Sequence, residues 1–296
     1  MLKSALFQRP ALSLAAVAAS MSAGLGACGS QYNNHTSKHR SAVVFHLSAQ
    51  DIDTLDIHTK KGRTDIAAHG QPWPDWAAGE IETEPSENPS EVVVIAVLQS
   101  NERKRLEGAT LEPSVDGGAV VLRAEWPWQI NDDNGDGVEY AIRLPRVENV
   151  TLDSSFGDFV VRGAHGEVDA DLGFGDAMLH AQHGPAQIDA GFGDIRVEFA
   201  TDGVDHGAER SNLDSGFGDI IALAVPAGLR ADTGFGDIRV ELTDDNAGPV
   251  RADSGFGDVK IVGGPALRAW QDGQANKGTR VSSGFGNAVV TIREAE

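Results

Sequence analysis

Aspartates recur at two fixed positions around a repeated Gly-Phe-Gly-Asp tetrapeptide in the second half of this 296-residue chain. One set lies three residues before the phenylalanine and comprises Asp153, Asp171, Asp189, Asp214, Asp232 and Asp253. The other lies two residues after it and comprises Asp158, Asp176, Asp194, Asp219, Asp237 and Asp258. If consecutive copies stack as neighbouring strands, each set becomes a column of carboxylates about 5 Å apart. Such neighbours repel by on the order of 1 kcal/mol per pair in water, so the columns need compensation.

Two kinds of compensation fit the second set, which falls in the predicted corner. The favoured interpretation is that each aspartate accepts backbone N–H hydrogen bonds within its own turn, as Asx residues do. The alternative is that the column binds divalent cations, because carboxylate oxygens are the ligands that Ca²⁺ prefers. Calcium is the one cofactor that the sequence suggests. In the last copy Ser282 and Asn287 take the two positions, so both columns are expected to stop at the C-terminal repeat.

A separate acidic segment matches the opening of a calcium-binding loop. Asp132, Asn134, Asp136 and Gly137 follow the pattern D-x-N-x-D-G. The twelfth position holds Arg143, where such a loop needs a bidentate Glu, and the intervening residues have the pattern of a strand. An acidic hairpin loop is therefore favoured over a calcium site.

Histidines and tryptophans offer weaker candidates for binding. His165 and His183 take equivalent places after successive phenylalanines and, with His180, could form a small metal site, although solvated turns are the favoured interpretation. Four tryptophans lie in two proline-containing loops: Trp73, Trp76, Trp126 and Trp128. Exposed tryptophan can stack on sugars, but we expect these side chains to cover the end of the repeat stack.

The spacing of the tetrapeptide identifies the elements that must position these groups. Its phenylalanines are separated by 18, 18, 25, 18, 21 and 29 residues, and they are Phe156, Phe174, Phe192, Phe217, Phe235, Phe256 and Phe285. A period near 18 is too short for an independent globular unit and indicates stacked repeats.

Hydrophobic residues alternate with polar residues on both sides of each motif. In the third copy Ala186, Ile188 and Ala190 precede Phe192, and Ile195 and Val197 follow it. Period-two alternation predicts a strand, a corner and a second strand per copy. The fold class is therefore all-β, a single-stranded β-helix (β-solenoid) with rungs of about 18 residues. The seven phenylalanines are in phase with the inward residues, so we expect them to stack inside as the structural core.

The rest of the domain is less regular. Insertions at 201–210 and 263–278 fall between one copy and the next, so they should leave the stack at the corner opposite the phenylalanines. We expect one domain over residues 43–296, with irregular early rungs or a cap over 43–149 and the seven rungs over 150–296. Residues 100–108 are charged and could form a helical turn.

The N-terminus has the pattern of a secretory leader. Residues 1–27 combine Lys3 and Arg9 with an apolar stretch, and they end in Leu25-Gly26-Ala27 before Cys28. This ending resembles the bacterial lipoprotein signal, which implies cleavage and lipidation of Cys28, a flexible tether over 28–42 and a membrane partner through the lipid. By the same resemblance, Gly29 after the cysteine implies the outer membrane of the cell envelope. Cys28 is the only cysteine, so no disulfide forms within the chain.

Charge and repetition restrict the classes of function. The formal net charge of −20 excludes the positive surface that nucleic acid requires. We expect no enzymatic activity, because the acidic groups repeat instead of forming one acid–base centre. Four basic residues near the corners have the pattern of outward strand positions: Arg162, Arg196, Arg239 and Lys260. A polysaccharide lyase or hydrolase, or a calcium-binding structural spacer, remains the alternative.

With these rungs, the Gly-x-Gly-Asp corners, the segment Ile142-Arg143-Leu144-Pro145 before the first rung and the lipoprotein leader, residues 43–296 resemble the "putative adhesin" β-strand-repeat family of bacterial envelope proteins. The resemblance implies a single-stranded β-helix and a binding, adhesin-like or scaffold role toward an envelope protein or polysaccharide. No catalytic residues carry over from that family.

Overall fold

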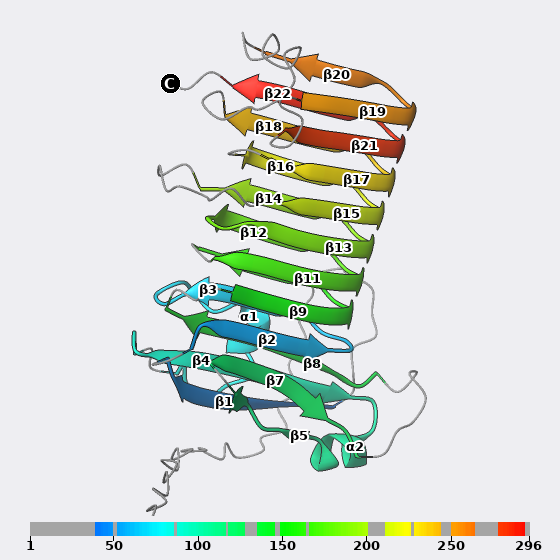
Figure 1. The fold of residues 1–296 in the computed structure, drawn as a ribbon. Coiled ribbons are helices and arrows are strands. Elements are labelled where there is room, and N and C mark those ends of the chain that lie inside the picture. Colours follow the sequence, from blue (N-terminus) through cyan, green and yellow to red (C-terminus); the bar gives the residue numbers. More distant parts are fainter. Residues whose placement is uncertain are drawn as a thin grey trace, which may run out of the picture.

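The computed structural model describes residues 39–49, 52–85, 88–116, 118–127, 135–145, 149–163, 166–200, 211–225, 228–243, 250–263 and 278–293. Cys28 and the predicted leader lie outside these ranges. Within them the protein is built from strands with two short helices, which confirms the all-β prediction. The strands form two eleven-stranded sheets, here called sheet A and sheet B (Figure 1).

Each copy of the tetrapeptide repeat contributes one strand to sheet B and the next strand to sheet A, and this pair is called a rung. The sheet B strands are β9 (Asn149–Phe156), β11 (Glu167–Phe174), β13 (Ala186–Phe192), β15 (Asn212–Phe217), β17 (Arg230–Phe235), β19 (Val250–Phe256) and β21 (Thr279–Phe285). Their sheet A partners are β10 (Phe159–Arg162), β12 (Ala177–Gln182), β14 (Ile195–Phe199), β16 (Ile220–Val225), β18 (Ile238–Thr243), β20 (Val259–Val262) and β22 (Ala288–Arg293).

Neighbouring rungs are parallel and in register. In sheet B, Asp171 pairs with Asp189 and Phe174 with Phe192, so equivalent residues of successive copies lie side by side. The insertion at 201–210 lies between β14 and β15, and the insertion at 263–278 lies between β20 and β21. Both therefore leave from the end of a sheet A strand, away from the phenylalanine corner, as predicted.

The order of the rungs in space departs from their order in the sequence. β21 lies between β17 and β19, and β22 lies between β18 and β20 (Figure 1). The seventh copy therefore lies between the fifth and the sixth, and the sixth forms the end of the stack. The expectation that the aspartate columns stop at the C-terminal repeat is wrong, because that repeat is an interior rung.

The N-terminal strands extend the same two sheets. They are β1 (His39–Ser48), β2 (Thr54–Thr59), β3 (Thr64–Ala68), β4 (Glu91–Ser100), β5 (Thr110–Leu111), β6 (Ser114–Asp116), β7 (Ala119–Glu125) and β8 (Gly137–Leu144). β2 and β3 pair in parallel with β9 and β10, and β7 and β8 continue beyond them. β1 and β4 are antiparallel strands of sheet A, and β5 and β6 are antiparallel to β7. β1 begins at His39, inside the range predicted as tether.

Two short helices lie among these N-terminal strands. α1 (Asp75–Ala78) packs near the outer face of β4, where Trp73 and Ala77 are buried with Val93, Ile95 and Ala141 in a small second core. Trp73 therefore covers a sheet face and not the end of the stack, contrary to expectation. α2 (Arg103–Gly108) is the helical turn predicted over 100–108.

The main core lies between the two sheets and consists of the inward residues of the strands. In the third rung Ala186, Ile188, Ala190, Ile195 and Val197 are all buried, as their alternation predicts. The phenylalanines of the tetrapeptide are not part of this core. The prediction that they form it is wrong, since all seven are exposed: Phe156, Phe174, Phe192, Phe217, Phe235, Phe256 and Phe285. The predicted column exists, but on the outside of the molecule.

Candidate functional site: an exposed phenylalanine ridge

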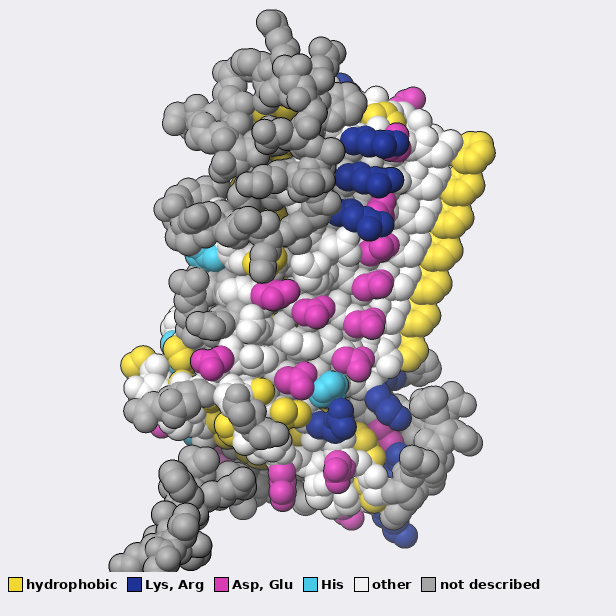
Figure 2. Space-filling model, viewed as in Figure 1, with side chains coloured by type: hydrophobic (Ala, Val, Ile, Leu, Met, Phe, Trp, Pro, Cys, Tyr) yellow, Lys and Arg dark blue, Asp and Glu magenta, His cyan; other side chains and the backbone are white. Residues whose placement is uncertain are grey.

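The seven phenylalanine rings form a continuous stack along one edge of the molecule, here called the Phe ridge (Figure 2). Their spatial order is Phe156, Phe174, Phe192, Phe217, Phe235, Phe285 and Phe256. Adjacent ring centroids are 4.7–5.0 Å apart and adjacent ring planes differ by 2–8°. Six of the side chains are 46–50% exposed, and Phe256 at the open end is 71% exposed.

The corner backbone explains why these rings face outward. Strand alternation assigns sides only while a strand runs straight, and the chain bends from sheet B to sheet A directly after the phenylalanine. The residue after it is a glycine with positive φ, +154° at Gly193. A β-carbon placed there would lie 2.0 Å from the carbonyl oxygen of Gly175 in the neighbouring rung. The corners thus stack backbone on backbone, and the bend takes the aromatic ring to the outer side.

A second row of glycines separates the ridge from the outward face of sheet B. A β-carbon at Gly191, before Phe192, would lie 2.7 Å from the carbonyl oxygen of Gly173. Rung stacking therefore leaves no room for side chains at the glycines of this row, and from Gly173 onward it is a strip of bare backbone beside the rings; Ser155 takes the same position in the first copy. In Figure 2 the strip separates the yellow ridge from a column of magenta acidic side chains.

That acidic column, here called the outward row, consists of the aspartates three residues before each phenylalanine. Its members are exposed or half-buried, as their outward phase predicted. Burial raises the pKa of Asp171, and the neighbouring carboxylates Asp189 and Asp153 raise it further. Burial also raises the pKa of Asp214, with Asp189 and Asp232 adding to the effect and Arg230 opposing it. A raised folded-state pKa means that ionisation of the row destabilises the fold as pH rises through these values.

The negative charge of the outward row is partly neutralised in the fifth and sixth copies. Arg230 Nε lies 2.5 Å from an oxygen of Asp232, and Arg251 Nε lies 2.8 Å from one of Asp253. Ser282 of the seventh copy lies between these two aspartates in register. Among the described residues no ion pair is found at Asp171, Asp189 or Asp214, so the negative charge is concentrated on the middle rungs.

The aspartates after each phenylalanine, here called the corner row, form a hydrogen-bonded ladder. The N–H of Asp194 donates to Asp176 Oδ1 at 2.9 Å, and the N–H of Asp219 donates to Asp194 Oδ1 at 2.8 Å. The same bond recurs from Asp237 to Asp219 at 2.7 Å. The favoured interpretation, in which each carboxylate accepts bonds from its own turn, is therefore wrong about the donor. Five of the carboxylates accept an N–H from the adjacent rung, because stacking places that donor directly beside them: Asp158, Asp176, Asp194, Asp219 and Asp237.

Asn287 continues this ladder where the seventh copy is inserted. Its N–H donates to Asp237 Oδ1 at 2.7 Å, and its own Oδ1 accepts the N–H of Asp258 at 3.0 Å. A neutral amide thus keeps the hydrogen bonds while it removes one charge from the column. No group of three or more His, Cys, Asp or Glu able to hold a metal ion is found among the described residues. Calcium binding along either row stays a prediction.

The rung formed by β2 and β3, which lies next to the first rung of the ridge, has basic residues at the positions of the phenylalanine and the aspartates. Thr59 pairs with Ser154, so counting onward places Lys61 at the phenylalanine position. Arg63 follows at the corner-row position, and its Nε lies 3.9 Å from Asp158 Oδ2. His58 pairs in register with Asp153 at the foot of the outward row. The ridge and both acidic rows therefore begin together, at β9.

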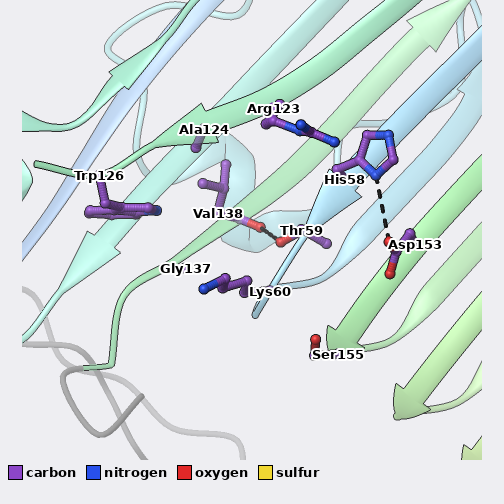
Figure 3. Close-up of a pocket in the computed structure, with 10 residues that line it drawn as sticks. All are labelled: His58, Thr59, Lys60, Arg123, Ala124, Trp126, Gly137, Val138, Asp153 and Ser155. Carbon is purple, nitrogen blue, oxygen red and sulfur yellow. Dashed lines mark hydrogen bonds and ion pairs between the residues drawn. The ribbon is translucent and has the colours of Figure 1, made fainter. Parts of the chain in front are cut away.

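A pocket of about 420 Å³ opens beside this start (Figure 3). His58, Lys60, Arg123 and Trp126 line it together with Asp153 and further small residues. His58 Nε2 lies 3.3 Å from Asp56 Oδ2, and its Nδ1 lies 3.7 Å from Asp153 Oδ2. The imidazole of His58 thus lies between two carboxylates. It is close to the start of the ridge but is not part of it.

The other predicted candidates are engaged in structural contacts or lie outside the described residues. Asp136 accepts a hydrogen bond from Ser100 Oγ at 2.6 Å and pairs with buried Arg105. Asp132 and Asn134 lie outside the described residues, as do His165 and Trp128. His180 Nδ1 lies 3.5 Å from Glu198.

The basic residues weighed as catalytic partners do not converge on one place. Arg162 pairs with Asp65, Arg239 pairs with Glu241, and Lys260 is exposed on the terminal rung. Arg196 lies at the register position of Met178 and Ile221, on the outer side of sheet A. These are the outward strand positions that the sequence predicted.

A sequence signal for the outward ridge was available. Every phenylalanine except Phe156 has glycine on both sides, so it has no neighbouring side chains to pack against at the bend. The turn of the preceding rung carries Lys61-Gly62 at the same positions, and a lysine there indicates a solvent-facing site.

Comparisons with known proteins give matches among solved structures only. No family model matches the chain, and no curated protein matches its sequence significantly. Among the described residues no helix is long and apolar enough to cross a membrane. Several solved structures align with most of the chain at low sequence identity. The "putative adhesin" of Bacteroides fragilis is 12% identical, with a TM-score of 0.44 over 87% of this chain and 99% of that one. The "putative cell adhesion protein" of Clostridium sporogenes is 11% identical, with a TM-score of 0.35 over 86% and 100%. The "putative lipid binding protein" of Parabacteroides distasonis is 10% identical, with a TM-score of 0.31 over 88% and 98%.

Proposed function

We propose that this protein is a non-enzymatic binding module of the bacterial cell envelope, built as a β-solenoid, and that the Phe ridge is its recognition surface. One observation carries the proposal: seven exposed aromatic rings are held in a row at a fixed spacing. Monomeric proteins rarely expose contiguous apolar surface of this extent, and where they do it commonly marks an interaction site.

Comparison of the copies with one another supports a specific role for the ring. Another outward position, four residues after the phenylalanine, changes freely in size and charge: Val160, Met178, Arg196, Ile221, Arg239, Lys260 and Val289. The exposed phenylalanine does not change in any copy. Stacking contributes to stability, about 0.5–1.5 kcal/mol per pair. Stability alone would be served as well by residues that face the core, whereas a binding surface needs the rings outside.

The arrangement of the rings selects the kind of contact. Each inner ring has both faces covered by its neighbours, so the ridge presents ring edges to solvent. Sugars stack on aromatic faces, and here only the two terminal rings offer one. We therefore propose an envelope protein, in preference to a polysaccharide, as the partner.

The proposed location depends on Cys28. We expect Cys28→Ser to move the chain from the membrane fraction to the soluble fraction, or to leave it with the mass of the unprocessed precursor, because no acyl chains can then be attached. Fractionation of the native cells and the intact mass of the protein measure this. If both properties match those of the wild-type chain, the chain is not anchored by lipid.

Site-specific photo-cross-linking in native cells tests the ridge. We expect benzoylphenylalanine at position 217 to give discrete cross-linked products, because it replaces a ridge ring that is 47% exposed. The matched control is the same photoreactive residue at Met178, which is 36% exposed on the outer side of sheet A. Identical products from both positions, or none from positions 174, 192 and 217, would exclude the ridge as the recognition surface.

A further inference from the structure

We infer that the partner surface recognised by the Phe ridge is a basic amphipathic α-helix of about 19 residues; this inference rests on the proposed function. The ridge spans six centroid steps of 4.7–5.0 Å, or roughly 29 Å. An α-helix rises 1.5 Å per residue, so about 19 residues cover that length.

Charge on both sides of the ridge selects a basic partner. On one side lies the outward row, which carries Asp171, Asp189 and Asp214 without ion pairs among the described residues. On the other side lies the corner row, in which Asp176, Asp194, Asp219, Asp237 and Asp258 are exposed. An apolar stripe between two acidic rows is complementary to an apolar stripe between two basic rows. Burial and neighbouring carboxylates raise the pKa of Asp171 and Asp214, and at Asp214 the nearby Arg230 offsets this effect only in part.

The surface relief selects a helix over an extended strand. Apart from Ser155 beside Phe156, the two rows that flank the rings are glycines without side chains, so the ridge stands between two strips of backbone. The apolar face of an amphipathic helix presents two adjacent lines of side chains, which can lie on these strips and straddle the rings. Lysines or arginines that flank the apolar face then reach the two aspartate rows. Side chains on one face of a strand recur every 6.6–6.8 Å, which does not match rings 4.7–5.0 Å apart.

Other occupants conflict with the same charges. A second copy of the chain docked ridge to ridge would place acidic rows against acidic rows in any orientation, at −20 formal charge per chain. An anionic lipid surface would be repelled by both rows. A basic helix is the occupant that satisfies the apolar stripe and both flanks together.

Peptide binding to the full chain carrying Cys28→Ser, which keeps the protein free of acyl chains, tests this inference. The probe is a fluorescein-labelled 20-residue peptide with leucine at helical periodicity and lysine elsewhere. Two control peptides are its glutamate counterpart and a peptide of the same Leu/Lys composition in scrambled order. We expect the Leu/Lys helix to bind at least about tenfold more tightly than either control by fluorescence anisotropy, and we expect its affinity to fall as salt rises.

Variants of the two surface features separate their roles. We expect Phe174→Ser with Phe192→Ser and Phe217→Ser to abolish binding of the probe, and Asp171→Asn with Asp189→Asn and Asp214→Asn to weaken it about tenfold. The matched control, Glu82→Gln with Glu84→Gln and Glu112→Gln, removes the same charge from exposed residues outside the two rows and should change affinity less than about twofold. Circular dichroism melts confirm that each variant is folded, and Phe192→Ser alone provides a milder ridge variant.

The outcomes distinguish the inference from the function on which it rests. If lysine and glutamate helices bind equally and the ridge variants abolish both, the ridge is a binding surface but the basic partner is wrong. If the scrambled peptide binds as tightly as the helical one, the helix is wrong. If neither ridge variant changes binding of the Leu/Lys helix, both the inference and the ridge as recognition surface are overturned. A dimer in sedimentation that the ridge variants dissolve would assign the ridge to a second copy.

Discussion

Gly193→Ala is expected to destabilise the protein by about 3–5 kcal/mol, although it adds one methyl group near the surface. Gly193 has a φ of +154°, where an L-residue is strained by about 1–3 kcal/mol. Its added β-carbon would also lie 2.0 Å from the carbonyl oxygen and 2.6 Å from the carbonyl carbon of Gly175. Both atoms belong to the backbone of the next rung, so relief requires the rungs to separate, and overpacking of this kind costs a further 1–3 kcal/mol.

Separation of the rungs would break the bonds that hold the corner together. The N–H of Gly175 donates to the carbonyl of Phe192 at 2.9 Å, and the N–H of Asp194 donates to Asp176 Oδ1 at 2.9 Å. The clash in Gly193→Ala therefore lies at the point where the ridge, the corner row and the strand ladder meet. A loss of the Phe stacking geometry should accompany the loss of stability.

Urea unfolding midpoints measure the effect, and another glycine separates its causes. Gly70 has a φ of +79° but no atom within 4 Å of the position its β-carbon would take. Gly70→Ala should therefore show the conformational cost alone, about 1 kcal/mol. Equal shifts for Gly70→Ala and Gly193→Ala would contradict the stacked-corner explanation, since the contact with Gly175 would then contribute nothing.

The repeat, the strand pattern and the inward residues could be predicted from the sequence, because they depend on local periodicity. Ile188 and Val197 lie on straight strands, where alternation determines the face. Phe192 lies at a bend, where alternation no longer assigns a side. The same phase argument that placed Ile188 correctly therefore placed Phe192 on the wrong side.

The rung order and the corner hydrogen bonds could not be predicted, because they depend on contacts between copies. Ser282 and Asn287 break the aspartate pattern, which suggested a terminal rung. In the structure Ser282 separates Asp232 from Asp253, and Asn287 separates Asp237 from Asp258. These uncharged side chains therefore interrupt the two columns of negative charge at an interior rung. A terminal and an interior place for the seventh copy fit the sequence equally well. Only the pairing of β21 with β17 and β19 shows that the place is interior.

A buried ion network joins the N-terminal strands to the first Phe rung. Arg143 of β8 is fully buried, and its Nη1 lies 3.0 Å from Oδ1 of Asp65 on β3. The other oxygen of Asp65 pairs with Arg162 of β10. Arg143 also donates to the carbonyls of Ile142 and Gln71, at 2.9 and 3.2 Å. Its guanidinium lies 4.5 Å from the ring centroid of Trp73.

Arg143→Ala should therefore destabilise the protein by about 3–5 kcal/mol, because it leaves the buried carboxylate of Asp65 with one partner and removes the cation over Trp73. Arg143→Lys keeps the charge but loses the planar fork that bonds several acceptors at once, so we expect an intermediate loss. The matched control is Arg239→Ala, whose exposed side chain pairs with Glu241 on sheet A and should contribute at most about 1 kcal/mol. Urea unfolding again measures all three. If Arg143→Ala shifted the midpoint no more than Arg239→Ala, the junction would be held by the strand pairing of β3 with β8 and β10 alone.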